Sequence, residues 1–94
     1  TGLGTPRLLE QRLREFFSDT IHISRITSIQ DLIKKPISED LVISTINIEI
    51  PDKPVVVVAP FLDEKSTGRI RKSVIKFYLK GKIQIVLVNY FQKN

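Results

Sequence analysis

The feature that most constrains the fold of this chain is an unbroken apolar run, Val-Val-Val-Val-Ala at residues 55–59, enclosed by Pro54 and Pro60. A strand with one face in water alternates apolar and polar residues, whereas a continuous apolar run is typical of a strand buried on both faces, as in parallel sheets. Two more β-branched runs cover residues 41–48 and 83–91, and a shorter strand pattern covers residues 20–26. We therefore expect a sheet whose strands are covered on both faces.

Helical patterns separate most of these strands. Apolar residues at i, i+4, i+7 and i+8 predict a helix over residues 5–17, with Thr5 as its cap and Pro6 at its first position. A Ser28–Asp31 capping pattern predicts a short helix over residues 29–35, and Asp63 begins a long one over residues 64–79. This order predicts one α/β domain over residues 1–94, built on a small, open, mainly parallel sheet with helices on both faces.

Composition excludes several classes of protein. The 94 residues contain no cysteine and one histidine, which excludes a disulfide scaffold, a thiolate nucleophile and a His-rich metal centre in this chain. We therefore predict no catalytic residue, no metal and no cofactor. No apolar run approaches the roughly 20 residues of a membrane span, so we expect a cytoplasmic protein without membrane insertion.

The first seven residues, Thr1, Gly2, Leu3, Gly4, Thr5, Pro6 and Arg7, form the most informative stretch. Two glycines let a backbone approach a ligand closely, and the N–H groups of the following first helical turn favour an anion. The loop lacks the lysine of a Walker motif and the third glycine of a dinucleotide fingerprint. Considered alone, it is either a phosphate loop, with Thr1, Gly2, Leu3, Gly4, Thr5 and Arg7 as its residues, or an ordinary turn into a helix.

Three segments in order carry a resemblance to a known family. Residues 2–9 (Gly-Leu-Gly-Thr-Pro-Arg-Leu-Leu), residues 40–45 (Asp-Leu-Val-Ile-Ser-Thr) and residues 54–62 (Pro-Val-Val-Val-Val-Ala-Pro-Phe-Leu) resemble the enzyme IIB domains of the bacterial sugar phosphotransferase system. The closest likeness is to the IIB-like domains of PRD-containing transcriptional regulators and antiterminators, of the mannitol and lichenan type. It covers about residues 1–80 and implies a flavodoxin-like, three-layer fold with a phosphate-binding loop.

The resemblance also implies what is missing. The family's acceptor cysteine would fall two positions before Thr1, and the strand that carries it, usually the central one, would precede the chain. We therefore expect a fragment that lacks its first strand. The extra C-terminal segment, residues 83–94, then has three open placements: it fills the gap, extends an edge, or pairs with another copy.

The expected function follows from this family. We expect a regulatory domain of a carbohydrate-responsive transcriptional regulator that senses phosphorylation or mediates protein interaction, and that is not an enzyme by itself. Its partners would be IIA-type phosphotransferase proteins or adjacent regulatory domains; a homodimer stays open, and DNA would be bound only through other domains. The alternative is a truncated IIB phosphocarrier subunit of a sugar transporter.

Other polar residues have two interpretations each. Ser44 and Thr45 end a strand and either face the loop or are ordinary strand residues. Residues 48–94 hold nine basic and four acidic side chains and therefore the whole net charge of +5. Within them, Lys65, Arg69, Lys72, Lys76 and Lys80 form a helical stripe that is either a docking face or a solvated one. We expect ordinary roles for His22, for Asp40 at the start of a strand, and for Asp63 with Glu64 as helix caps.

Overall fold

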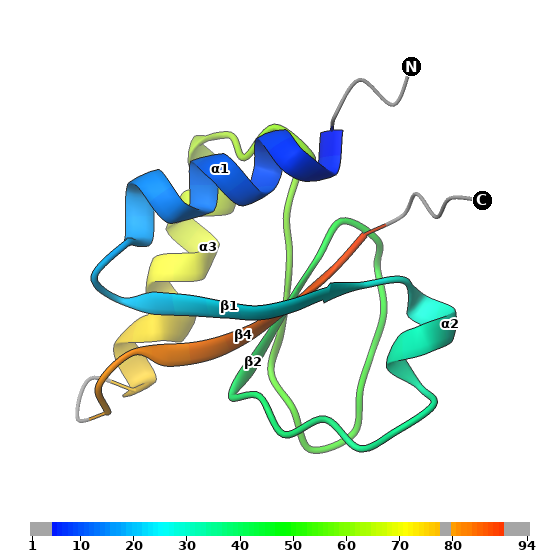
Figure 1. Cartoon of the computed structure of the whole chain (residues 1–94). Coiled ribbons are helices and arrows are strands. Elements are labelled where there is room, and N and C mark those ends of the chain that lie inside the picture. The colour runs from blue at the N-terminus through cyan, green and yellow to red at the C-terminus, as the bar shows by residue number, and fades with distance from the viewer. Residues whose placement is uncertain (1–4, 78–79, 90–94) are drawn as a thin grey trace.

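A computed structural model of the chain describes residues 5–77 and 80–89. Its elements, in chain order, are α1 (Thr5–Phe17), β1 (Ile21–Thr27), α2 (Ile29–Leu32), β2 (Leu41–Ser44), β3 (Val55–Val57), α3 (Glu64–Val74), the 3-10 helix η1 (Ile75–Phe77) and β4 (Ile83–Val88). The predicted alternation of helices and strands is confirmed (Figure 1).

The strands form one sheet in the order β1-β4-β2-β3, and every neighbouring pair is parallel. The predicted α/β class with a parallel sheet is therefore confirmed. The last strand of the chain, β4, lies inside the sheet between β1 and β2. The sequence left three placements open for the C-terminal segment: in a gap of the sheet, at an edge, or paired with another copy. The structure places β4 inside the sheet and not at an edge.

The two faces of the sheet are covered differently. One face packs against α1 and α3 and forms the larger core, which includes Leu13 of α1, Ile70 of α3 and Ile85 of β4. The opposite face carries a smaller core around Leu32 of α2 and Val86 of β4, with half-buried side chains from the segments that follow α2 and β2. The expected helices on both faces are present, although α2 has only four residues.

Several expectations about the elements were wrong in detail, including the end of α2, which lies at Leu32 rather than at residue 35. The strand β3, predicted to be buried on both faces, is an edge strand in which only Val56 is buried and its two neighbours are half-buried. The helix α3 ends at Val74 and continues as one 3-10 turn, rather than as an α-helix to residue 79. The strand β2 ends at Ser44 instead of residue 48, because the Ser44 hydroxyl bonds the backbone of Ile46 and turns the chain there.

Candidate functional site

The carboxyl ends of the four parallel strands meet at one edge of the sheet, the place where open α/β folds bind ligands. Both longer helices begin on this side (Figure 1). The first turn of α3 is tied to the end of β3, because the backbone N–H of Ala59 donates to the Ser66 hydroxyl at 2.9 Å. The middle of α1 lies beside the same loop, where Arg12 donates to the Phe61 carbonyl at 3.1 Å.

The two helix N-termini at this edge differ in charge. The first turn of α3 is occupied by its own acids: Asp63 accepts the N–H of Ser66 at 2.9 Å, and Glu64 follows. Hydrogen bonding to Ser66, from its side chain and from its backbone N–H, lowers the pKa of Asp63 below the usual value. The first turn of α1 contains no acidic residue. Of these two helix N-termini, only that of α1 therefore lacks a carboxylate.

The predicted phosphate-loop residues are only partly within the described chain. Thr1, Gly2, Leu3 and Gly4 lie outside the described residues. Thr5 is the first residue of α1, so the predicted start of the helix is confirmed, and Arg7 has an exposed side chain in the first turn of the helix. What the described residues offer an anion is the N-terminal turn of α1, on which Arg7 has an exposed side chain.

Ser44 and Thr45 reach the carboxyl edge, as predicted, but their described contacts hold the backbone. The Ser44 side chain is fully buried, donates to the Ile46 carbonyl at 2.6 Å and accepts the Ile46 N–H at 3.0 Å. The Thr45 N–H donates to the Val88 carbonyl at 3.1 Å and holds β2 to the end of β4. The Ser44 hydroxyl is therefore engaged in a turn and is not presented to a ligand.

Asn89 is a polar residue at this edge that the sequence patterns did not single out. It directly follows β4, is 6% exposed, and its N–H donates to the Thr27 carbonyl at 3.0 Å. Because β4 lies between β1 and β2, this asparagine lies at the middle of the carboxyl edge. In the sequence, this position is marked only by a polar residue directly after an apolar strand pattern. Its place at the middle of the edge follows from the strand order, which the sequence does not show.

A buried carboxylate that the sequence patterns also missed joins three segments on the smaller-core face. Glu39 is 7% exposed; it accepts the Ser24 hydroxyl at 2.6 Å and the Arg25 guanidinium at 3.1 Å, and its carbonyl accepts Lys53 at 2.6 Å. Burial raises the pKa of Glu39, but the hydrogen bonds from Ser24 and Arg25 together outweigh it and leave the pKa below the usual value. Every polar group here has a partner, so the cluster joins the segments and offers no open position to a ligand.

Other predicted polar residues have ordinary contacts. His22 is exposed on β1, and its Nδ1 lies 2.8 Å from Oε1 of Gln84 on the neighbouring β4. Asp40 stands directly before β2 and accepts the backbone N–H of Gln84 at 2.8 Å. The expectation of a structural role for these two side chains agrees with these contacts.

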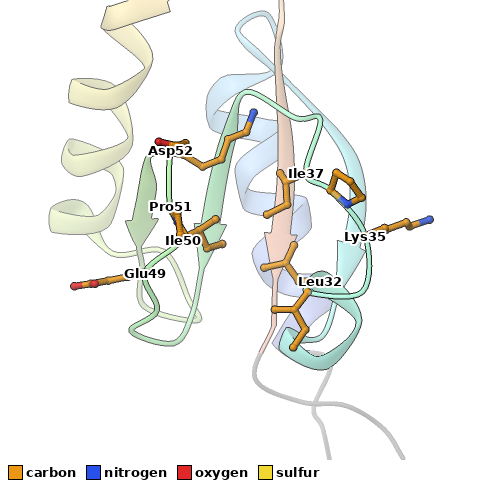
Figure 2. Close-up of a pocket in the computed structure, with 10 residues that line it drawn as sticks. Leu32, Lys35, Ile37, Glu49, Ile50, Pro51 and Asp52 are labelled. Atoms are coloured by element: carbon orange, nitrogen blue, oxygen red, sulfur yellow. The ribbon is translucent and has the colours of Figure 1, made fainter.

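An open cavity of about 410 Å³ lies away from the carboxyl edge, between α2 and the segment that joins β2 to β3. Figure 2 shows Leu32, Ile37 and Ile50 in its interior, while Lys35 and Glu49 point away from it on opposite sides. The cavity has apolar walls and a rim with both charge signs, with Asp52 and Lys53 among its lining residues. It brings together none of the predicted site residues.

The described residues contain no group of three His, Cys, Asp or Glu side chains placed to hold a metal ion. Within the same part of the chain, no helix has the length and apolar character that crossing a bilayer requires. The chain matches no known protein family, and it matches neither a curated protein nor a solved structure.

Proposed function

We propose that this chain is a regulatory domain of the enzyme IIB type, belonging to a bacterial carbohydrate-responsive transcriptional regulator, that recognises a phosphoryl group carried by a phosphotransferase partner or by an adjacent segment. The observation that carries the proposal is the N-terminus of α1, which lies at the carboxyl edge without an acidic residue and with Arg7 exposed beside it. The three motifs in family order and the all-parallel sheet support it.

The chemistry limits what the chain does in this role. No cysteine is present among the 94 residues, so the chain itself forms no cysteine phosphate. Backbone N–H groups at a helix N-terminus and a guanidinium bind a phosphate without covalent chemistry. These 94 residues therefore bind a phosphoryl group without forming a covalent bond to it.

The first experiment tests the anion site in the chain as it stands. A ¹⁵N-labelled sample is titrated with inorganic phosphate, with chloride at equal ionic strength as the reference. We expect the largest shifts at the amides of Thr5 and residues 7–9, and loss of these shifts in Arg7→Glu. Lys82→Glu, which changes the net charge equally but lies just before β4, is the matched control and retains them. Shifts spread evenly over the basic surface, or equal loss in both variants, would contradict the proposal.

The second experiment tests the regulatory role. The parent protein is incubated with phosphoenolpyruvate and the general phosphotransferase components, and phosphocysteine is sought by mass spectrometry. If an intact, cysteine-containing parent carries no phosphocysteine, the sensor role is contradicted and only the protein-interaction role stands. The coding sequence distinguishes the alternative: regulatory and DNA-binding regions upstream favour the regulator, whereas a start codon about ten residues upstream, with a cysteine two positions before Thr1, favours a IIB subunit.

A further inference from the structure

The outer edge of β3 presents backbone groups without partners. The inner groups of this segment pair with β2: the Pro54 carbonyl accepts Val42 N–H at 3.0 Å, and Val58 N–H donates to the Ser44 carbonyl at 2.8 Å. Since backbone groups alternate sides along a strand, those of Val55 and Val57 point outward. The Val57 carbonyl accepts the Arg69 guanidinium at 3.0 Å. Within residues 5–77 and 80–89, the other outward groups, both N–H groups and the Val55 carbonyl, have no partner.

A groove of about 370 Å³ runs along this edge between β3 and α3, lined by Val55, Val56, Val57, Arg69, Lys72 and Ser73. Figure 2 shows α3, in pale yellow, beyond β3 on the side away from β2. The strand therefore supplies an apolar wall with open hydrogen-bonding groups, and the helix supplies a cationic wall. A ligand that fits both walls needs an extended backbone and negative charge.

The helix that lines the groove is basic. Residues 65–82 contain no acidic side chain and seven basic ones, Lys65, Arg69, Arg71, Lys72, Lys76, Lys80 and Lys82, of which Arg69 and Lys72 line the groove. Lys72 of the groove and Lys76 after it are exposed and make no ion pair in the described part of the chain. Negative charge on a ligand would therefore meet Lys72, which makes no ion pair among the described residues, and Arg69, which also acts electrostatically on Asp63.

We propose that an acidic, extended peptide segment of a protein partner adds to the sheet as a fifth strand along β3. Its backbone pairs with the outward N–H groups of Val55 and Val57 and with the Val55 carbonyl, and its carboxylates face Arg69 and Lys72. Main-chain pairing of this kind provides affinity, while side chains at alternate positions provide specificity. This surface is distinct from the N-terminus of α1, so the inference does not depend on the proposed anion site.

Two other occupants fit the groove less well. A nucleic-acid backbone is acidic, but it has no row of N–H donors to match the Val55 carbonyl, and no aromatic side chain lines the groove for base stacking. A second copy of the chain paired edge to edge would bring two sets of Arg69 and Lys72 together, and like charges repel. An acidic peptide satisfies both the backbone and the cations.

The geometry also predicts the pattern of the peptide. Side chains of a strand point to opposite faces alternately, so carboxylates two residues apart lie on the face toward α3. Pro54 before β3 and Pro60 after it limit the paired length. The segment recognised is therefore short, with acidic residues at every second position and apolar or β-branched residues between them.

The experiment uses the full chain and a fluorescein-labelled nine-residue peptide of alternating Glu and Val, followed by anisotropy and by ¹⁵N chemical shifts. We expect saturable binding, with shifts concentrated at residues 55–58 and 69–73. Lys72→Glu weakens binding about tenfold because it places like charge against the peptide. The control Lys82→Glu, which changes the net charge equally outside the groove, weakens binding less than threefold.

Two N-methylated peptides separate strand addition from charge attraction. One carries N-methyl groups on its Glu residues and the other on its Val residues, so the methyl groups lie along opposite edges of the strand. We expect one peptide to lose binding and the other to retain it. Equal binding by both, equal effects of the two lysine variants, or the same shifts from a single-stranded oligonucleotide of equal charge would overturn the proposal.

Discussion

Asp40 joins the beginnings of β2 and β4, and its removal tests whether this contact holds the last strand inside the sheet. Its Oδ2 accepts the backbone N–H of Gln84 at 2.8 Å, its own N–H donates to the Gln84 carbonyl at 2.9 Å, and its Oδ1 lies 3.1 Å from Lys80 Nζ. The side chain of Asp40 is 18% exposed and that of Lys80 is 50% exposed. The hydrogen bond is therefore the better protected of the two side-chain contacts.

The expected loss of stability follows from these contacts. In Asp40→Ala the Gln84 N–H loses a charged acceptor, which costs about 1.5–3 kcal/mol, and a half-exposed ion pair adds at most about 1 kcal/mol. We expect a decrease of about 2–3 kcal/mol in the free energy of unfolding, or roughly 10–20 °C in Tm for a chain of this size. Lys80→Ala, which removes only the ion pair, is expected to cost less than about 1 kcal/mol.

Acid gives a second measure of the same contact. Burial raises the pKa of Asp40. The hydrogen bonds from Gln84 and Lys80 and the charges of Lys80 and Lys53 lower it by more, so the pKa of Asp40 is below the usual value. The depressed pKa stabilises the fold above the aspartate pKa of the unfolded chain, and this stabilisation is lost as the pH falls through the folded-state pKa. The stability advantage over Asp40→Asn should therefore disappear in acid. Urea unfolding at pH 7 and pH 2.5 measures it.

Equal destabilisation by Asp40→Ala and Lys80→Ala would contradict this expectation, because the hydrogen bond to the Gln84 N–H would then contribute nothing beyond the ion pair. A Gln84 amide that exchanges with solvent no faster in Asp40→Ala than in the wild-type chain would contradict it as well. Asp40→Asn, which keeps an acceptor at the same position, should fall between the wild type and Asp40→Ala.

Three further substitutions test the core and the buried polar contacts by urea unfolding. Glu39→Ala leaves the three-quarters-buried Arg25 side chain without its carboxylate and should cost about 2–4 kcal/mol; the pair contributes no specific stability if the costs of Glu39→Ala and Arg25→Ala simply add in the double variant. Ser66→Ala removes the acceptor of Ala59 N–H and should cost about 1–2 kcal/mol, whereas an unchanged midpoint would mean that this bond is dispensable. Leu13→Ala at a fully buried position should cost about 2–5 kcal/mol, and a loss below 1 kcal/mol would contradict the described packing of α1.

The elements could be predicted from the sequence wherever the signal was local. The helix from Thr5 to Phe17 follows from its apolar period and its first two residues, and the structure has the same bounds. The cap of α3 is equally local, because Asp63 acts on the N–H of Ser66, three residues later. The parallel α/β class follows from the alternation of such elements, each of which needs only its own residues to be recognised.

The strand order could not be predicted in this way. An apolar run shows that side chains leave water, but it does not show which backbones pair. The run at residues 55–59 suggested an interior strand, yet β3 is at an edge, where Val56 and Val58 enter the core while Val55 and Val57 are half-buried. Interior positions belong to β2 and β4, whose buried residues face both cores.

For Ser44 and Thr45, the position at a strand end could be predicted from the sequence, but their contacts could not. Parallel strands bring Ser44 and Thr45 to the carboxyl edge in any order, so this part of the prediction needed no tertiary information. The hydroxyl of Ser44, however, bonds the backbone two residues later, which hydroxyl residues commonly do at turns. Asn89 depends on long-range pairing, because it enters the edge only through the position of β4.

The basic residues of the C-terminal half, which their helical spacing predicted to form one stripe, differ in what they contact in the folded chain. Arg69 donates to the edge of β3, and Lys80 pairs with Asp40 at the start of β2. Lys72 makes no ion pair in the described residues. Neutralising Lys80 should therefore change the stability of the sheet, whereas reversing Lys72 should change binding and leave stability nearly unaltered. A stripe that served only to solvate the helix would show neither difference, so these two lysines separate a structural charge from one available to a partner.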